Sequence, residues 1–541
     1  MRENGKTWYR ICKMLCEYKK YFPGIICCLL GSSFITFIHP LLIRQITDCG
    51  ILQKNMKYIL LFSVILIIIS LTQQELNIIQ TKLFSNVHNQ FTHSLYKKTY
   101  WKINRMKIQY FAERGSAEII NTIGMDIDNV SSVVDQITQF SISSILQIIG
   151  GVVGLSLLDW KLAILIEAII PLKFIIVSYC ANKKREVFEQ WIEDKRKFMS
   201  WFAECINGIH EMKLWNLFQV KKSQFEGLQK DLMDSYKKNA MLDEYSTVSV
   251  VVIDTVVNAL LYILSGLFII KGEFTIGAFA FITYSAYVVN PISALINIKY
   301  YFAQIEPSAK RLFELWGQPE ELEMKLCEMK PEKIYQDRDM VFEVKNLVFG
   351  YEPGHPILNG ISLCVKKGER IAIVGENGSG KSTLLNLLAG FYRPQKGIIK
   401  LYGAPVELMD IQDMRNRIAV ISQRPYLFQG TIEENVNIDG KASRDAVVEA
   451  CRKSGALGFI EKLDHGFGQK IGQDGAKLSG GERQKIAVAR ALLKNADILL
   501  MDEATEGFDV ESNEALRELL HSELKNKTIV FITHKYKELE S

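Results

Sequence analysis

The stretch that decides the fold reads Gly375-Glu376-Asn377-Gly378-Ser379-Gly380-Lys381-Ser382. It matches the phosphate-binding P-loop pattern at every fixed position. A strand-like segment, 370–374, precedes it, and a helix-like segment, 382–389, follows it. Glycines let backbone N–H groups face phosphates, while Lys381 supplies a cation for the β- and γ-phosphates and Ser382 a hydroxyl for Mg²⁺. This loop, together with Thr383, therefore predicts an ATP-binding α/β domain.

A second apolar strand ends in two carboxylates, in the sequence Ile498-Leu499-Leu500-Met501-Asp502-Glu503. In nucleotide hydrolysis, Asp502 would hold Mg²⁺ through water and Glu503 would polarise the attacking water. An apolar strand that ends in Asp-Glu is weak evidence alone. The P-loop about 120 residues upstream makes the pair a strong prediction of ATP hydrolysis.

A third motif, Leu478-Ser479-Gly480-Gly481-Glu482, immediately precedes a helix-like segment, 483–493. Here the chain resembles the ATP-binding cassette (ABC) superfamily, whose signature motif is nearly this string and more often ends in Gln. Small residues at a helix N-terminus form an anion site. The resemblance implies that this site binds the γ-phosphate of the ATP held by a partner subunit, so that two ATPs lie between two nucleotide domains.

Four further positions match the family's motifs in order. The resemblance implies that Tyr351 stacks on adenine and that Gln423 links Mg²⁺ and water to the membrane domain. It also implies that Asp509 is the D-loop aspartate and that His534 contacts the γ-phosphate. Each residue alone would be an ordinary surface residue. Their order and spacing together favour the family.

The sequence departs from the family pattern in two places. The D-loop, usually Ser-Ala-Leu-Asp, reads Glu506-Gly507-Phe508-Asp509, which could alter coupling between the two ATP sites. The chain stops at Ser541, where family members usually continue for several dozen residues, so less cover is expected over the sheet. Few residues precede the first apolar segment, so no domain that cleaves a cargo leader is expected.

The first ~300 residues hold six apolar segments long enough to cross a bilayer. They are 21–43, 58–79, 131–158, 162–179, 248–270 and 276–298. Lys and Arg gather before the first segment and in the long connections after the second and fourth. The positive-inside rule therefore predicts that both termini, both long connections and the ATP-binding domain are cytosolic. The long connections are expected to continue the membrane helices.

The membrane half resembles the exporter-type ABC fold independently. The matching positions surround both predicted coupling helices, one outer turn, the last two spans and the start of the linker. They include Asp126, Gly208, the run Asp159-Trp160-Lys161-Leu162, Pro291 and Arg311.

Other features carry less information. The ten cysteines follow no disulfide or metal spacing, and the net charge of +5 does not indicate nucleic-acid binding. Glu167 and Asp254 lie within predicted spans, where charges are functional candidates. They could line a cavity for cationic cargo. Pairing with a polar group on a neighbouring helix is the favoured interpretation.

These patterns predict a multidomain fold, with an all-α six-helix transmembrane domain of ABC exporter type (1–316), a linker (317–339) and an α/β P-loop ABC domain (340–541). The expected function is ATP- and Mg²⁺-dependent export of a small molecule, lipid or peptide across the cell membrane by alternating access. One P-loop and one signature per chain require a dimer, by default a homodimer. A heterodimer, a slow regulatory half-transporter or an importer on the same fold are alternatives. Six spans exclude a soluble ABC ATPase.

Overall fold

The computed structural model describes residues 2–112, 116–135, 140–158, 160–270, 278–321, 339–352, 354–472, 475–503 and 510–533. The chain forms two compact units. The first contains Met1–Trp101 and Ser116–Gln318, and the second contains Lys102–Gly115 and Pro319–Ser541.

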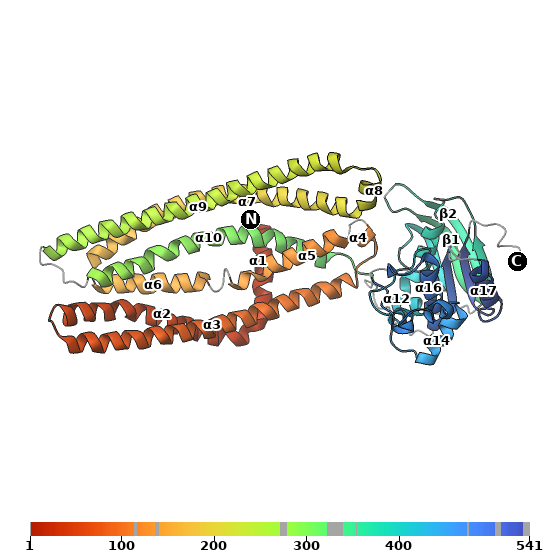
Figure 1. The fold of residues 1–541 in the computed structure, drawn as a ribbon, viewed down its shortest axis with the longest axis horizontal. Helices are drawn as coiled ribbons and strands as arrows, with labels where there is room; N and C mark the ends of the chain where they lie inside the picture. The colour runs from red at the N-terminus through yellow and green to blue at the C-terminus, as the bar shows by residue number, and fades with distance from the viewer. Residues whose placement is uncertain are drawn as a thin grey trace. The chain divides into compact units, whose positions relative to one another are not determined.

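The first unit is helical throughout its described residues (Figure 1). Its elements are α1 (Arg2–Leu15), η1 (Cys16–Tyr21), α2 (Phe22–Gln45), η2 (Ile46–Ile51), α3 (Met56–Ile103, which runs into the second unit), α5 (Ser116–Ser131), α6 (Phe140–Leu158), α7 (Trp160–Asn207), α8 (Ile209–Leu214), α9 (Phe218–Ile270) and α10 (Ala278–Gly317). The helix α9 has 53 residues, so at 1.5 Å per residue it is about 80 Å long, more than twice the hydrocarbon thickness. The prediction that membrane helices continue past the apolar segments is confirmed.

Three helices among the described residues are long and apolar enough to cross a membrane: Lys6–Ile51, Met56–Ile103 and Phe218–Ile263. A shorter apolar helix covers Ile142–Leu157. Predicted spans four and six fall on α7 and α10, apart from 276–277, which lie outside the described residues. Predicted span three, 131–158, covers the last residue of α5, residues 132–135 and α6, while 136–139 lie outside the described residues.

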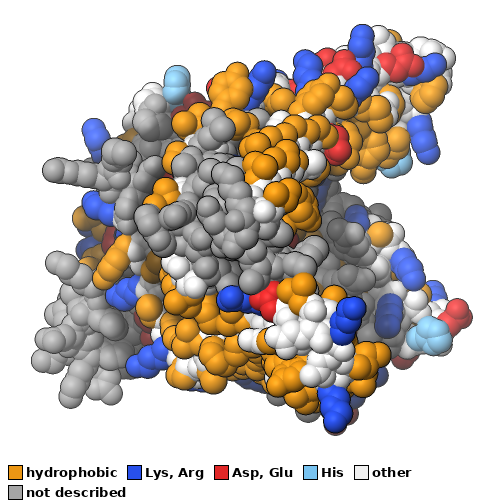
Figure 2. Space-filling view, turned by 90° about the vertical axis from the view of Figure 1, so that its left-hand side faces the viewer, with side chains coloured by type: hydrophobic (Ala, Val, Ile, Leu, Met, Phe, Trp, Pro, Cys, Tyr) orange, Lys and Arg blue, Asp and Glu red, His pale blue; other side chains and the backbone are white. Residues whose placement is uncertain are grey.

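Apolar side chains cover the outside of the long helices. Leu60 and Ile67 on α3 and Val252 and Ile263 on α9 are each more than half exposed. Figure 2 shows hydrophobic side chains over much of the described surface at one end of this unit. A soluble protein would bury such side chains, whereas a lipid-facing surface requires them. The unit is membrane-embedded.

Close packing joins α6 to α10. A Cβ added at Gly151 would lie 2.6 Å from Val288 Cγ2, and one at Gly154 would overlap the Tyr284 ring. Small residues allow such close approach between membrane helices. At the far end of α10, Arg311 forms a bidentate pair with the buried Asp126 of α5, with Nε 2.9 Å from Oδ2. Both residues belong to the exporter-like positions in the sequence.

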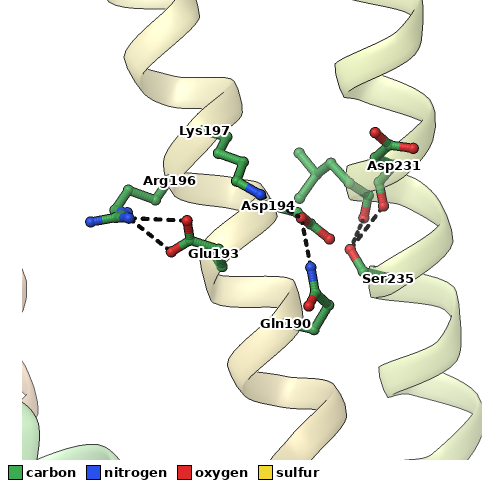
Figure 3. A network of polar contacts seen from close by, with 8 residues as sticks. Gln190, Glu193, Asp194, Arg196, Lys197, Asp231 and Ser235 are labelled. Atoms are coloured by element: carbon green, nitrogen blue, oxygen red, sulfur yellow. Dashed lines mark hydrogen bonds and ion pairs between the residues drawn. The ribbon is translucent and has the colours of Figure 1, made fainter.

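The polar parts of α7 and α9 are solvated surfaces rather than sites. Gln190 donates to Asp194 at 2.9 Å and Arg196 to Glu193 at 3.0 Å, and both contacts stay within α7 (Figure 3). Exposed pairs of this spacing stabilise a helix by about 0.3–0.5 kcal/mol each. They maintain the helix outside the apolar segments.

The second unit contains two sheets. An antiparallel sheet has the order β2-β1-β4-β5, and a parallel sheet has the order β3-β8-β7-β6. The strands are β1 (Met340–Phe349), β2 (Leu358–Lys366), β3 (Arg370–Ile373), β4 (Lys396–Leu401), β5 (Ala404–Pro405), β6 (Ile418–Ile421), β7 (Ile498–Asp502) and β8 (Thr528–Ile532). The helices are α4 (Gln109–Ala112), α11 (Lys381–Leu388), α12 (Ile411–Arg417), α13 (Ile432–Val436), α14 (Arg444–Lys453), α15 (Leu457–Ile460), α16 (Gly480–Lys494) and α17 (Val510–His521), with short 3₁₀ turns at Val406–Leu408 and Gly466–Gly468. The predicted α/β fold is confirmed.

A buried ion pair explains one of the two charges expected within membrane spans. Lys173 on α7 is fully buried, and its Nζ lies 2.6 Å from Asp254 Oδ1 on α9 and 2.8 Å from the Val289 carbonyl on α10. The interpretation that Asp254 pairs across helices is confirmed. Its partner Lys173 was missed, because it lies inside an apolar run. The Glu167 side chain lies outside the described residues.

We expect Asp254→Asn to lower the free energy of unfolding by about 3 kcal/mol, because it leaves the Lys173 charge buried without its counter-ion. Thermal unfolding of the full chain in detergent measures this loss. The matched control is Asp234→Asn, an exposed position on the same helix. The double variant Lys173→Met with Asp254→Leu should regain most of the stability. An unchanged unfolding temperature for Asp254→Asn would contradict a structural role for the pair.

Candidate nucleotide site

The P-loop connects β3 to α11, as its sequence predicts. Gly378 and Gly380 have φ of +84° and +89°, a region that residues with a Cβ rarely adopt. A Cβ at Gly375 would lie 2.9 Å from Ser379 Oγ. Lys381 Nζ donates to the carbonyls of Gly375 and Glu376, each at 2.8 Å. The ammonium group is therefore held above a tightly curled loop, the arrangement that suits phosphate binding.

Tyr351 lies beside the loop. Its hydroxyl is 3.3 Å from Thr383 Oγ1, in the first turn of α11. Phe349 and Tyr392 contact its ring nearly edge-on, with centroids 5.3 and 5.2 Å away. The side chain remains 39% exposed. A ring fixed by aromatic neighbours yet accessible can stack on a purine base.

The two carboxylates at the end of β7 lie next to the P-loop. Burial raises the pKa of the Asp502 carboxyl, and a hydrogen bond from Ser382 opposes that rise. The next residue, Glu503, has φ of +46°, an unusual conformation for a residue with a side chain. Gln423, two residues after β6, donates its Nε2 to Glu503 Oε2 at 2.8 Å. Four predicted residues from three segments therefore meet at one edge of the sheet.

The signature motif forms the start of α16 rather than preceding it. The helix begins at Gly480, with Ser479 as its N-cap. Ser479 Oγ accepts from the Glu482 N–H at 3.3 Å, and Glu482 Oε2 accepts from the Ser479 N–H at 2.8 Å. This capping box satisfies two backbone donors and extends the helix to Gly480. The predicted start at 483 is therefore wrong by one turn.

Two residues on the signature helix, Gln484 and Arg490, were missed from the sequence. Gln484, on the signature helix, donates to the Ser422 carbonyl at 3.2 Å, beside Gln423. Arg490 on the same helix donates to the Tyr426 carbonyl and to Asn435. Burial lowers the pKa of Arg490 to about 10, so it remains charged at neutral pH. Long polar side chains on the buried face of α16 were the available signal.

Two predicted residues, Asp509 and His534, lie outside the described residues, as does the departing sequence of the D-loop.

Comparison with protein families covers both units. Residues 22–292 match the family of ABC transporter transmembrane regions. Residues 358–506 match the ABC transporter family. The chain belongs to the ABC transporter family. The activity of this ABC transporter is ATP hydrolysis coupled to transport.

Curated relatives match most of the chain. An ATP-dependent lipid A-core flippase of Alcanivorax borkumensis is 28% identical over 84% of this chain and 78% of its own length. A putative export ATP-binding/permease protein of Rickettsia bellii is 27% identical over 99% and 93%. The solved structure of a bacterial Atm1-family ABC exporter with ATP bound has a TM-score of 0.84 at 21% identity, covering 96% of this chain and 92% of that one. At that identity, the structural match shows a shared fold.

We expect Ser479→Ala to remove one cap hydrogen bond and cost about 1 kcal/mol of stability. It should also lower ATPase activity, because the first turn of α16 loses its fixed geometry. The matched control is Ser443→Ala, since Ser443 caps α14 by the same kind of bond to Ala446. The control should lose similar stability, measured by thermal unfolding, and keep its ATPase rate. Equal ATPase loss in both variants would mean that destabilisation alone explains the effect.

Proposed function

We propose that two copies of this ABC transporter form a lipid exporter in the cell membrane, driven by ATP and Mg²⁺. The catalytic part of this proposal rests on the 2.8 Å contact between Gln423 and Glu503, next to Asp502 and the P-loop. This contact joins Glu503, the candidate general base, to Gln423 in the segment that follows β6. The lipid cargo rests on the relatives named lipid A-core flippases.

The predicted residues then take definite roles. The backbone and Lys381 of the P-loop bind the phosphates, and Tyr351 stacks on adenine. Glu503 orients and deprotonates the attacking water, while His534 contacts the γ-phosphate. The signature, 478–482, binds the γ-phosphate of the ATP held by the partner, and Asp509 lies at the interface between the two domains.

The donors at the edge of the sheet fit Mg²⁺. A Ser382 hydroxyl, a Gln423 amide oxygen and an Asp502 carboxylate are hard oxygen ligands, which Mg²⁺ prefers. Ser382 and Asp502 are already hydrogen-bonded to each other. The bound ion would neutralise charge that develops on the phosphates.

A dimer follows from the separation of the two halves of each ATP site. The chain carries one P-loop and one signature. ATP that contacts both would hold two nucleotide domains together, and hydrolysis would release them. Such a ligand-biased two-state element can switch the membrane helices between inward- and outward-facing states. The Lys and Arg distribution supports a cytosolic location for both termini and the ATP-binding domain.

The test compares ATPase activity of the purified full chain in lipid nanodiscs with that of Glu503→Gln. The substitution should lower kcat by about 10²–10⁴-fold, the usual contribution of a general base, and leave ATP binding intact. Lys381→Ala should abolish ATP binding. Glu461→Gln, an exposed glutamate in the same unit, is the control and should keep the parent rate.

Movement of a fluorescent lipid between leaflets of vesicles tests the cargo. It should require ATP and fail with Glu503→Gln. Parent-like hydrolysis by Glu503→Gln would overturn the catalytic assignment. A folded parent chain without turnover would show that a different partner subunit or further C-terminal residues are needed.

A further inference from the structure

A polar cavity of about 260 Å³ lies within the first unit, among α2, α3 and α6. Among the ten described residues that line it, eight have uncharged polar side chains and the other two are leucines. The polar residues recur every three or four positions along each helix, for example Ser32, Ser33 and Thr36 on α2 and Gln73, Asn77 and Gln80 on α3. This spacing places each set on one helix face, so that polar faces of three helices meet.

The same helices are otherwise strongly apolar. The membrane-crossing windows that contain α2 and α3 each have a mean hydropathy of 2.0. Polar side chains inside membrane helices are rare because burying them is unfavourable. A set of eight around one cavity is therefore a candidate functional feature, although Ser33 and Gln73 also form hydrogen bonds between the helices.

The amide groups in this cavity have more hydrogen-bonding capacity than the protein uses. Gln73 Nε2 donates to Ser32 Oγ at 3.0 Å and to Asn77 Oδ1 at 3.2 Å, but its Oε1 is buried with no partner. Gln80 is 7% exposed, and its side chain makes no hydrogen bond to any residue that the structure describes. Buried amides nearly always have partners, so the cavity itself is expected to supply them.

We propose that this cavity binds an uncharged, hydroxyl- or amide-bearing group of the transported molecule. Its volume corresponds to about eight or nine water molecules at roughly 30 Å³ each, enough for a polar group of the size of one sugar ring. The described lining residues offer donors and acceptors but no compensating charge, so an ionised group would bind at a large desolvation cost. The group could belong to a lipid headgroup or to a free solute. The link to transport rests on the proposed exporter function.

The ion pair between Lys173 and Asp254, the only charged pair described above within the predicted spans, also favours an uncharged ligand. Lys173 is already neutralised by Asp254 and by a backbone carbonyl. It lies on α7, whose described residues do not line the cavity. The unused hydrogen-bonding groups in the cavity are therefore uncharged amides and hydroxyls.

Binding is measured without nucleotide, on the full chain in phosphatidylcholine nanodiscs, with three radiolabelled probes. They are monoglucosyl dioleoylglycerol, dioleoyl phosphatidic acid and free glucose. We expect the glucosyl lipid or glucose to bind saturably, and whichever binds identifies the source of the group. Gln80→Leu should weaken that binding by about tenfold, the factor that one hydrogen bond supplies. It breaks no hydrogen bond of the described chain. Gln74→Leu, an exposed neighbour on α3, should bind like the parent.

The outcomes separate this proposal from the proposed function. Lys381→Ala should bind the probe like the parent, so a failure of ATP hydrolysis would not imitate a failure of the cavity. Binding of phosphatidic acid that depends on Gln80 would overturn the uncharged class. Binding of no probe, with a higher unfolding temperature for Gln80→Leu, would show that the cavity holds only water. Equal binding by Gln80→Leu and the parent would place the site elsewhere.

Discussion

The parallel pairing of β3, β8 and β7 is the constraint on which the nucleotide site depends. Ile532 of β8 pairs with Ile373 on one side and Asp502 on the other. The P-loop and the two carboxylates therefore begin at the same edge, on either side of one strand. A slip of one residue would turn Asp502 to the opposite face of the sheet. The left-handed backbone of Glu503 occurs at this edge, and such strain is characteristic of functional positions.

The membrane half treats its polar groups in two different ways. Where Lys173 is buried, a carboxylate and a carbonyl satisfy it, and the result is a closed cross-link of α7, α9 and α10. Where α2, α3 and α6 bring amides and hydroxyls together, the protein leaves the buried Gln73 Oε1 without a hydrogen-bond partner beside a cavity. Buried polar groups are unfavourable in lipid in both places. The satisfied ion pair is a structural contact, whereas the cavity with unused hydrogen-bonding groups is suited to a ligand.

Patterns of a few adjacent residues predicted the elements better than their ends. The P-loop, the strand before Asp502 and the long helices were all predicted, because spacing and hydropathy act on the local backbone. The start of α16 at Gly480 depends on a reciprocal cap between Ser479 and Glu482. This boundary depends on side-chain contacts that periodicity does not report.

The sequence by itself determined the family, the class of chemistry and the residue types at the nucleotide site, because phosphate binding and hydrolysis require them at fixed spacing. Only the tertiary structure decided which distant side chains meet. Gln423 and Glu503 are 80 residues apart, Lys173 and Asp254 are 81 apart, and Gln484 and Ser422 are 62 apart. The rotation of each helix and the order of the strands select these partners, and those depend on packing over the whole unit rather than on any local run of residues.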